Sequence, residues 1–226
     1  MNRAAVSTVL MVFPVVILAG ALSAESPPDS RFTPARLHYS GGGDWYGNEA
    51  SWSNLLTGLA QRTSIACARK EAVVTLKSNN IFYYPFVTLT GHGNVTFSDD
   101  EAERLKRYLT GGGFLWVDDD FGLDEHLRPA LKKVFPGNDL VELPFSHPIY
   151  HSLYDFKDGL PKIHEHHGGA PHGYGLFHQG RLVLFYSYNT DIGDGLEDPE
   201  VHNDPPAKRE AALRMGINVV VYALSH

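Results

Sequence analysis

The sequence has a single cysteine, Cys67, among its 226 residues, which excludes a disulfide within the chain. It also lacks the G-x-S-x-G and G-x-C-x-G motifs that place a nucleophile on a sharp turn between a strand and a helix. A lone cysteine outside such a turn is usually unreactive. The sequence therefore offers no catalytic nucleophile of this kind.

Basic residues are few and scattered. The chain has 19 Lys and Arg against 26 Asp and Glu, a formal net charge of −7, and its densest basic groups are the pairs 132–133 and 208–209. Binding to a phosphate backbone requires a basic patch. We therefore expect no nucleic-acid partner.

Long apolar runs are absent except at the start of the chain. Residues 4–22 are mostly apolar and follow Arg3, and small residues offer cleavage points at 19–21 and at Ala24. We expect residues 1–24 to be a signal peptide and the mature protein to lie in the periplasm or outside the cell, with no transmembrane segment left. An uncleaved N-terminal anchor is the alternative, because the run is close to the length of a membrane span.

The remaining sequence predicts a short linker, 25–31, and a single α/β domain, 32–226. An apolar strand at 86–90, a helix opened by the capping-box pair Ser98 and Glu101, and a buried strand at 114–117 form a βαβ unit, whose strands should be parallel. We predict a flavodoxin-like three-layer sandwich with a mostly parallel sheet and a His-rich irregular insertion at 144–178. Further expected elements are strands at 33–39, 72–76, 174–178 and 181–188, helices at 49–61, 124–134 and 207–224, and an acidic loop at 189–206.

Polar loops follow three of the expected parallel strands. Glycines and acids stand at 41–44, 91–94 and 118–120, and the carboxyl ends of parallel strands meet at one rim, where ligands bind. An acidic segment at 191–198 resembles a calcium loop, but Gly193 breaks the EF-hand spacing. Taken singly, each loop is also explained as an ordinary turn. The residues expected to bind a ligand are Asp44, His92, Asn94, Asp118, Asp119 and Asp194.

Histidines concentrate in the irregular segment, where seven of the twelve lie between His147 and His178. Imidazoles with nearby carboxylates suit zinc, copper or iron, although Gly168 stands where an H-E-x-x-H motif needs its second histidine. The alternative is a solvated polar loop. The expected cofactor is a divalent metal such as zinc, and its expected ligands are His147, His151, His164, His166 and Asp118.

Several motifs in a fixed order resemble those of a known family. They are the G-G-D-W turn at 42–45, T-G-H-G at 90–93, V-D-D at 117–119, S-H-P-I-Y-H at 146–151 and D-I-G-D-G at 191–195. With them the chain resembles, over about 32–224, the bacterial family catalogued as domain of unknown function 4159. The resemblance implies a fold similar to class I glutamine amidotransferase-like domains and an association with the cell envelope. It implies no amidotransferase activity here, because the cysteine that this activity needs is missing.

Three functions remain open from the sequence. The first is a non-catalytic module that binds a small molecule, a glycan or an envelope protein. The second is a metal-dependent hydrolase, in which His92, His147 and His151 would act with the acids at 118–119 to activate water. The third is a structural subunit of an envelope complex.

Overall fold

The protein is described by a computed structural model over residues 31–164 and 167–226. The expected signal peptide, most of the expected linker and the metal candidate His166 lie outside these residues. Within the described ranges, none of the helices combines the length and apolar composition that a membrane crossing requires.

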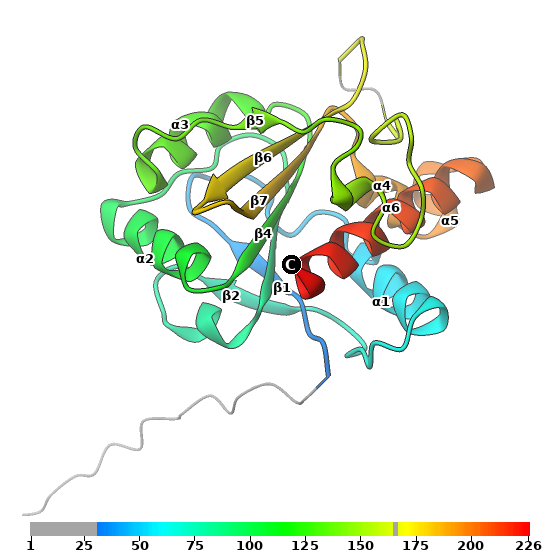
Figure 1. Cartoon of the computed structure of the whole chain (residues 1–226), viewed down its shortest axis with the longest axis horizontal. Helices are drawn as coiled ribbons and strands as arrows, with labels where there is room; N and C mark the ends of the chain where they lie inside the picture. Colours follow the sequence, from blue (N-terminus) through cyan, green and yellow to red (C-terminus); the bar gives the residue numbers. More distant parts are fainter. Residues whose placement is uncertain (1–30, 165–166) are drawn as a thin grey trace, which may run out of the picture.

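A mixed sheet forms the centre of the described structure (Figure 1). Its seven strands follow the order β2-β1-β3-β4-β7-β6-β5. The first five in this order pair in parallel, and β6 and β5 continue the sheet antiparallel. The parallel part has the strand order of flavodoxin-like sheets, in which the order reverses beside the first strand. The strands are β1 (Ala35–His38), β2 (Ala72–Thr75), β3 (Phe86–Leu89), β4 (Phe114–Asp118), β5 (Val141–Glu142), β6 (His172–His178) and β7 (Arg181–Tyr188).

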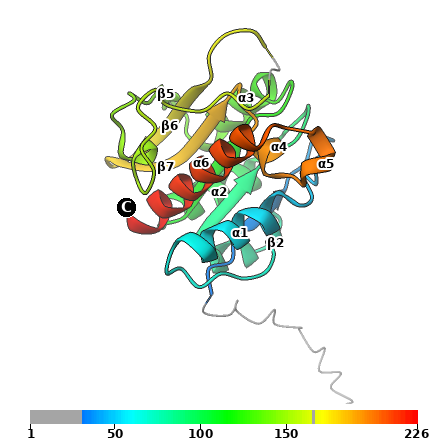
Figure 2. The same cartoon turned by 90° about the vertical axis from the view of Figure 1, so that its right-hand side faces the viewer.

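Helices cover both faces of the sheet, as Figures 1 and 2 show. Helices α2 and α3 pack together on one face, and α1, α4 and α6 pack together on the other. Because β3 and β4 are covered on both faces, every residue in them is buried, which explains their almost continuous apolar sequence. The helices are α1 (Ser51–Arg62), α2 (Asp99–Thr110), α3 (Asp124–Val134), α4 (Ile192–Leu196), α5 (Pro199–His202) and α6 (Pro206–Ser225), with 3-10 helices η1 (Asn80–Tyr83) and η2 (Pro148–Tyr150).

Most expected elements are confirmed within one or two residues. The capping box is present in full, since Ser98 accepts from the Glu101 amide and Glu101 accepts from the Ser98 amide. The parallel pair β3–β4 and the hairpin β6–β7 also form as predicted. Gly216 of α6 is a close-packing point, because a Cβ there would lie 3.0 Å from the Leu55 side chain.

The prediction of a plain acidic loop at 189–206 is wrong. Two short helices, α4 and α5, occupy it. Their four or five residues are too few to show a helical period, and α4 is held by packing against α1 and α6. Between β5 and β6, by contrast, η2 is the only helix among the described residues 143–164 and 167–171.

Candidate metal-binding rim

The loops at the carboxyl ends of the parallel strands contact one another and form a rim. The Gly43 amide of the loop after β1 donates to the Asn94 carbonyl of the loop after β3 at 3.1 Å. The Asp119 amide after β4 donates to the Ser187 carbonyl of β7, also at 3.1 Å. The parallel topology therefore brings together segments that are far apart in the sequence, as the strand-end rule predicts.

Two buried residues, Arg36 in β1 and Tyr39 directly after it, support the loop that follows the strand. The Arg36 guanidinium, 3% exposed, donates to the Asn48 carbonyl at 3.0 Å and pairs with Glu71 at 3.1 Å. The Tyr39 hydroxyl lies under the loops, where a Cβ on Gly43 would be 2.6 Å from it and a Cβ on Gly91 2.5 Å from it. Only glycine fits at these two positions, so the loops approach each other closely over the tyrosine.

Asp44, His92 and Asp120 form a first cluster on this rim, called here the His92 group. His92 Nδ1 lies 2.9 Å from Asp44 Oδ2, and His92 Nε2 lies 2.7 Å from Asp120 Oδ1. Each residue can offer one ligand atom within 4.8 Å of those of the other two. The His92 side chain is 57% exposed, whereas that of Asp120 is 4% exposed, so the cluster opens to solvent on the imidazole side.

The two carboxylates govern the protonation of His92. Burial disfavours the imidazolium, but the hydrogen bond to Asp44 and the charges of Asp120 and Asp44 outweigh it and raise the pKa of His92. Burial raises the pKa of Asp120 to about 6, and the charge of His92 opposes that rise. The two carboxylates therefore favour the protonated, positively charged form of the imidazole between them.

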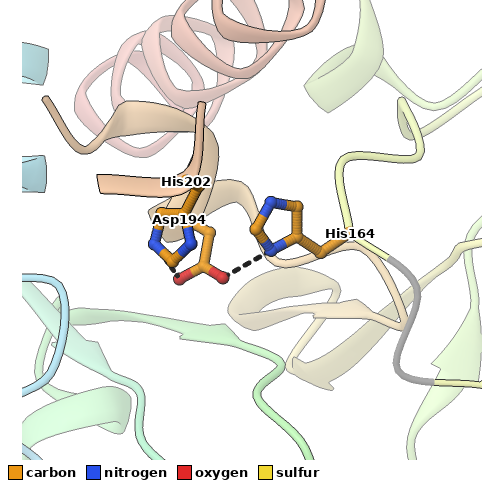
Figure 3. Close-up of side chains that lie close together, drawn as sticks. All are labelled: His164, Asp194 and His202. Atoms are coloured by element: carbon orange, nitrogen blue, oxygen red, sulfur yellow. Dashed lines mark ion pairs between the residues drawn. The ribbon is translucent and has the colours of Figure 1, made fainter. Parts of the chain in front are cut away.

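His164, Asp194 and His202 form a second cluster, called here the His164 group (Figure 3). His164 Nδ1 lies 2.6 Å from Asp194 Oδ2, and His202 Nε2 lies 3.5 Å from Asp194 Oδ1. The two imidazole rings are 4.8 Å apart between centroids and nearly perpendicular. Both imidazoles thus point at the same carboxylate, from different segments of the chain.

The residues around the His164 group hold its members in place. His164 Nε2 lies 3.0 Å from Asp204 Oδ2, whose side chain is only 7% exposed. Asp194 is fixed by the start of α4, where its amide donates to the Asp191 carboxylate at 3.0 Å. His202 is the last residue of α5, a helix with proline at its first position. The second nitrogen of His164 is therefore oriented by a buried carboxylate, as is usual for metal-bound histidine.

The two clusters share one electrostatic environment. The negative charge of Asp194 contributes to raising the pKa of both His92 and Asp120. Asp191 is buried, and burial together with the charges of Asp194, Asp118 and Asp120 raises its pKa well above its ordinary value. It therefore interacts with an acid of each cluster. The rim thus gathers more carboxylates than cationic side chains.

Asp118 and Asp119, both expected to bind a ligand, serve as anchors of the β7–α4 turn. Asp118 accepts from the Ser187 hydroxyl and the Gly193 amide, each at 2.5 Å. Asp119 accepts from the Tyr186 hydroxyl and the Asn189 amide, each at 2.7 Å. Burial raises the pKa of Asp118 to about 7 despite these hydrogen bonds. Their oxygens are used for holding the backbone, which leaves Asp120 as the acid of this run that faces the rim.

A small cavity lies beside Asp118. Among the side chains that line it are Asn48, Thr90 and Arg36. The Asn48 Nδ2 and Thr90 Oγ1 atoms are buried and have no hydrogen-bond partner among the described residues. The cavity measures about 20 Å³, which accommodates about one water molecule. A ligand larger than water therefore does not fit inside this cavity.

Two other expected metal ligands, His147 and His151, do not join this rim. His147 caps η2, with its Nδ1 accepting from the Ile149 amide at 3.2 Å, and burial lowers its pKa. His151 is held by Asp155 at 2.6 Å and by the Phe145 carbonyl at 2.7 Å. In the described residues, neither belongs to a group of three metal-ligating side chains. Of the four expected ligands that the structure describes, only His164 lies in such a group.

Sequence reasoning missed Asp120, His202 and Asp204 as site residues. Asp120 follows Asp118 and Asp119, which were predicted to bind a ligand. The alternation of side chains along a strand cannot give the direction of the Asp120 side chain, because β4 has already ended. His202 and Asp204 lie in the segment taken for an acidic loop. The chain order His202-x-Asp204 after the D-I-G-D-G motif was the available signal. Asn94 contributes its backbone carbonyl, and its side chain is exposed.

Comparison with known proteins gives a family without an assigned activity. The family described as Domain of unknown function (DUF4159) matches residues 33–224. No curated protein matches the sequence.

Proposed function

The chain belongs to the family described as Domain of unknown function (DUF4159), and we propose that it is a metal-dependent hydrolase whose metal is held by the His164 group. The observation that carries this proposal is the placement of one ligand atom each from His164, Asp194 and His202 within 4.8 Å of one another. Two imidazoles and one carboxylate suit zinc and other divalent transition metals.

The separations in the group fit a metal site. Ligand atoms about 2.0–2.2 Å from a tetrahedral zinc ion lie roughly 3.3 Å apart. The distances from His164 and His202 to Asp194, 2.6 and 3.5 Å, lie on either side of that value. These two separations are therefore close to those expected around a bound ion.

The number of ligands favours chemistry over a structural role. Structural zinc sites have four protein ligands, whereas three ligands leave a position for water or substrate. The side chains of His164 and His202 are 23% and 30% exposed, so such a position would be reachable from solvent. A bound ion would lower the pKa of its water and make hydroxide available near neutral pH.

The first test is metal content, with a matched histidine as control. The mature protein should retain about one equivalent of zinc, iron or copper by plasma mass spectrometry, and His164→Ala and His202→Ala should lose it. His172→Ala is the control, because His172 also pairs with a carboxylate, Glu142 at 2.7 Å, but belongs to no group of three metal-ligating side chains among the described residues. Equal metal retention in all three variants, or no binding by the unmodified protein, would contradict the proposal.

A non-catalytic binding module is the second candidate. It is favoured by the size of the cavity at the rim, which holds about one water molecule and so offers no deep substrate pocket. A small molecule, a glycan or an envelope protein would then lie on the open surface. Retained metal together with no hydrolysis across phosphate, acyl and glycosyl substrates would favour this function.

We also propose that the protein acts outside the cytoplasm. The support for this is the sequence of residues 1–24, with its basic start, apolar run and small residues before the cleavage points. Sequencing of the mature N-terminus should find cleavage after Ala21 or Ala24. A chain that still begins at residue 1 would favour the uncleaved anchor.

A further inference from the structure

The His92 group is separate from the metal site proposed above. Its members follow β1, β3 and β4, whereas the His164 group comes from the segment before β6 and from α4 and α5. It shares no residue with that group. It also differs in chemistry, because it offers two carboxylates and one imidazole instead of two imidazoles and one carboxylate.

The site is built by several independent contacts. Asp44 Oδ1 accepts from the His92 amide while Asp44 Oδ2 pairs with the ring, so the carboxylate and the histidine orient each other. Asp120 is fixed on the other side, where its Oδ1 accepts from the Phe121 amide at 2.9 Å. The imidazole lies between the two carboxylates, where it takes the place of a cation.

A buried hydroxyl under the group lacks a partner. Tyr39 is 5% exposed, and its hydroxyl has no hydrogen-bond partner among the described residues. It lies against Gly43 and Gly91, the residues next to Asp44 and His92. Burial and then the charges of Asp44 and Asp120 raise the pKa of Tyr39. A buried hydroxyl without a partner is unfavourable, and water bound to a cation at this group would provide the missing partner.

We propose that Asp44, His92 and Asp120 bind a second divalent cation, of the oxygen-preferring class that includes Mn²⁺ and Mg²⁺. Carboxylates and water are the ligands that these ions select, and Mg²⁺ and Mn²⁺ sites keep several waters. The exposure of His92, 57%, and of Asp44, 36%, leaves room for such waters. To bind the cation, His92 would turn away from one carboxylate and offer that ring nitrogen to the ion.

Titration with Mn²⁺, followed by loss of the free-ion signal in electron paramagnetic resonance, tests the proposal. His164→Ala should keep one Mn²⁺ bound, whereas Asp44→Asn and Asp120→Asn in the same background should weaken its binding at least about tenfold, as loss of an orienting carboxylate does even outside the ligand set. Asp155→Asn is the matched control, because Asp155 pairs with His151 at 2.6 Å away from the rim. The melting temperature of each variant verifies that it is folded.

The outcomes separate this proposal from the metal-dependent hydrolase. Loss of zinc in His164→Ala with retained Mn²⁺ binding supports both sites, and retained Mn²⁺ binding without any zinc site supports this one alone. The proposal is overturned if the folded protein does not bind Mn²⁺, if Asp44→Asn and Asp120→Asn bind it as the control does, or if His164→Ala abolishes all Mn²⁺ binding.

Discussion

Gly91 shows how one residue determines the geometry of the rim. Its φ is +126°, and a Cβ there would lie 2.5 Å from the Tyr39 hydroxyl and 2.9 Å from the Asp44 backbone. Gly93, two residues later, also has positive φ, +77°, but a Cβ on it would meet nothing within 4 Å. Alanine substitutions at these two glycines therefore separate the cost of backbone strain from the cost of a steric clash.

Gly91→Ala should destabilise the protein by about 2–4 kcal/mol, because strain and overpacking add. Gly93→Ala should cost about 1 kcal/mol, since it carries strain alone. Urea unfolding measures both. Equal costs would show that the tyrosine and the loops can move apart, and that the close approach is not enforced.

Asp204 permits a sharper test at the same scale. It contacts His164 through the ring nitrogen that faces away from Asp194, so Asp204→Asn should weaken zinc binding about 10–100-fold without removing a ligand. A competition titration with a chromophoric chelator measures the change. Unchanged affinity would mean that Asp204 does not orient the imidazole.

The sequence could identify the rim but not all of its residues. Asp44 and His92 were predicted because glycines and acids follow strands whose parallel order could be inferred, and Asp194 because the acidic segment at 191–198 resembles a calcium loop. Asp118 could not be distinguished from Asp120, because the distinction depends on which carboxylate meets the amides of the β7–α4 turn, a contact across 75 residues. Tertiary hydrogen bonds of this kind leave no local pattern.

At the scale of elements, α6 holds the irregular segment in place through Asn218. This residue is fully buried, accepts from the Leu153 and Tyr154 amides at 3.0 and 2.8 Å, and donates to the Tyr154 carbonyl at 2.7 Å. A segment with little regular structure of its own needs such partners for its backbone. Helix α6 was predicted from its apolar composition, but this role of its asparagine was not.

Asn218→Leu should destabilise the protein by about 2–4 kcal/mol, because it leaves three backbone groups without a partner. Asn138→Ala is a suitable control, since its exposed side chain makes one 3.4 Å contact with the Phe177 carbonyl, and it should change stability by less than about 0.5 kcal/mol. Hydrogen exchange at Leu153 and Tyr154 should rise in Asn218→Leu alone. Unchanged exchange would place the anchor of the segment elsewhere.

At the scale of the whole molecule, the carboxylates at one end of the sheet make stability depend on pH. Burial raises the pKa of Asp118 to about 7 and of Asp120 to about 6, and it also raises the pKa of Asp119 and Asp191. For an acid whose pKa is higher in the folded state, the folded protein binds more protons. Stability is therefore lost as pH rises from about 4 to the folded-state value, and it stays level above that.

The metal-free protein, kept in chelator, should accordingly melt at least about 5 °C lower at pH 8 than at pH 5. The raised pKa of His92 acts in the same direction, because its stabilising charge is lost at high pH. Asp118→Asn should show a smaller difference between the two pH values, whatever its absolute stability. A higher melting temperature at pH 8 would contradict the assignment of these acids.

The N-terminus of α1 has a consequence for the order in which the chain folds. No side chain of its own N-cap residue caps this helix, and its first amides, at Ala50 and Ser51, donate instead to the carboxylate of Glu197, which lies 147 residues later. Strand β7 likewise takes its central place beside β4 only after the intervening segment has been made. Contacts between residues this far apart in the sequence form late and slowly. The first half of the chain should therefore stay incompletely folded during synthesis and reach its native structure only when the last third has been made.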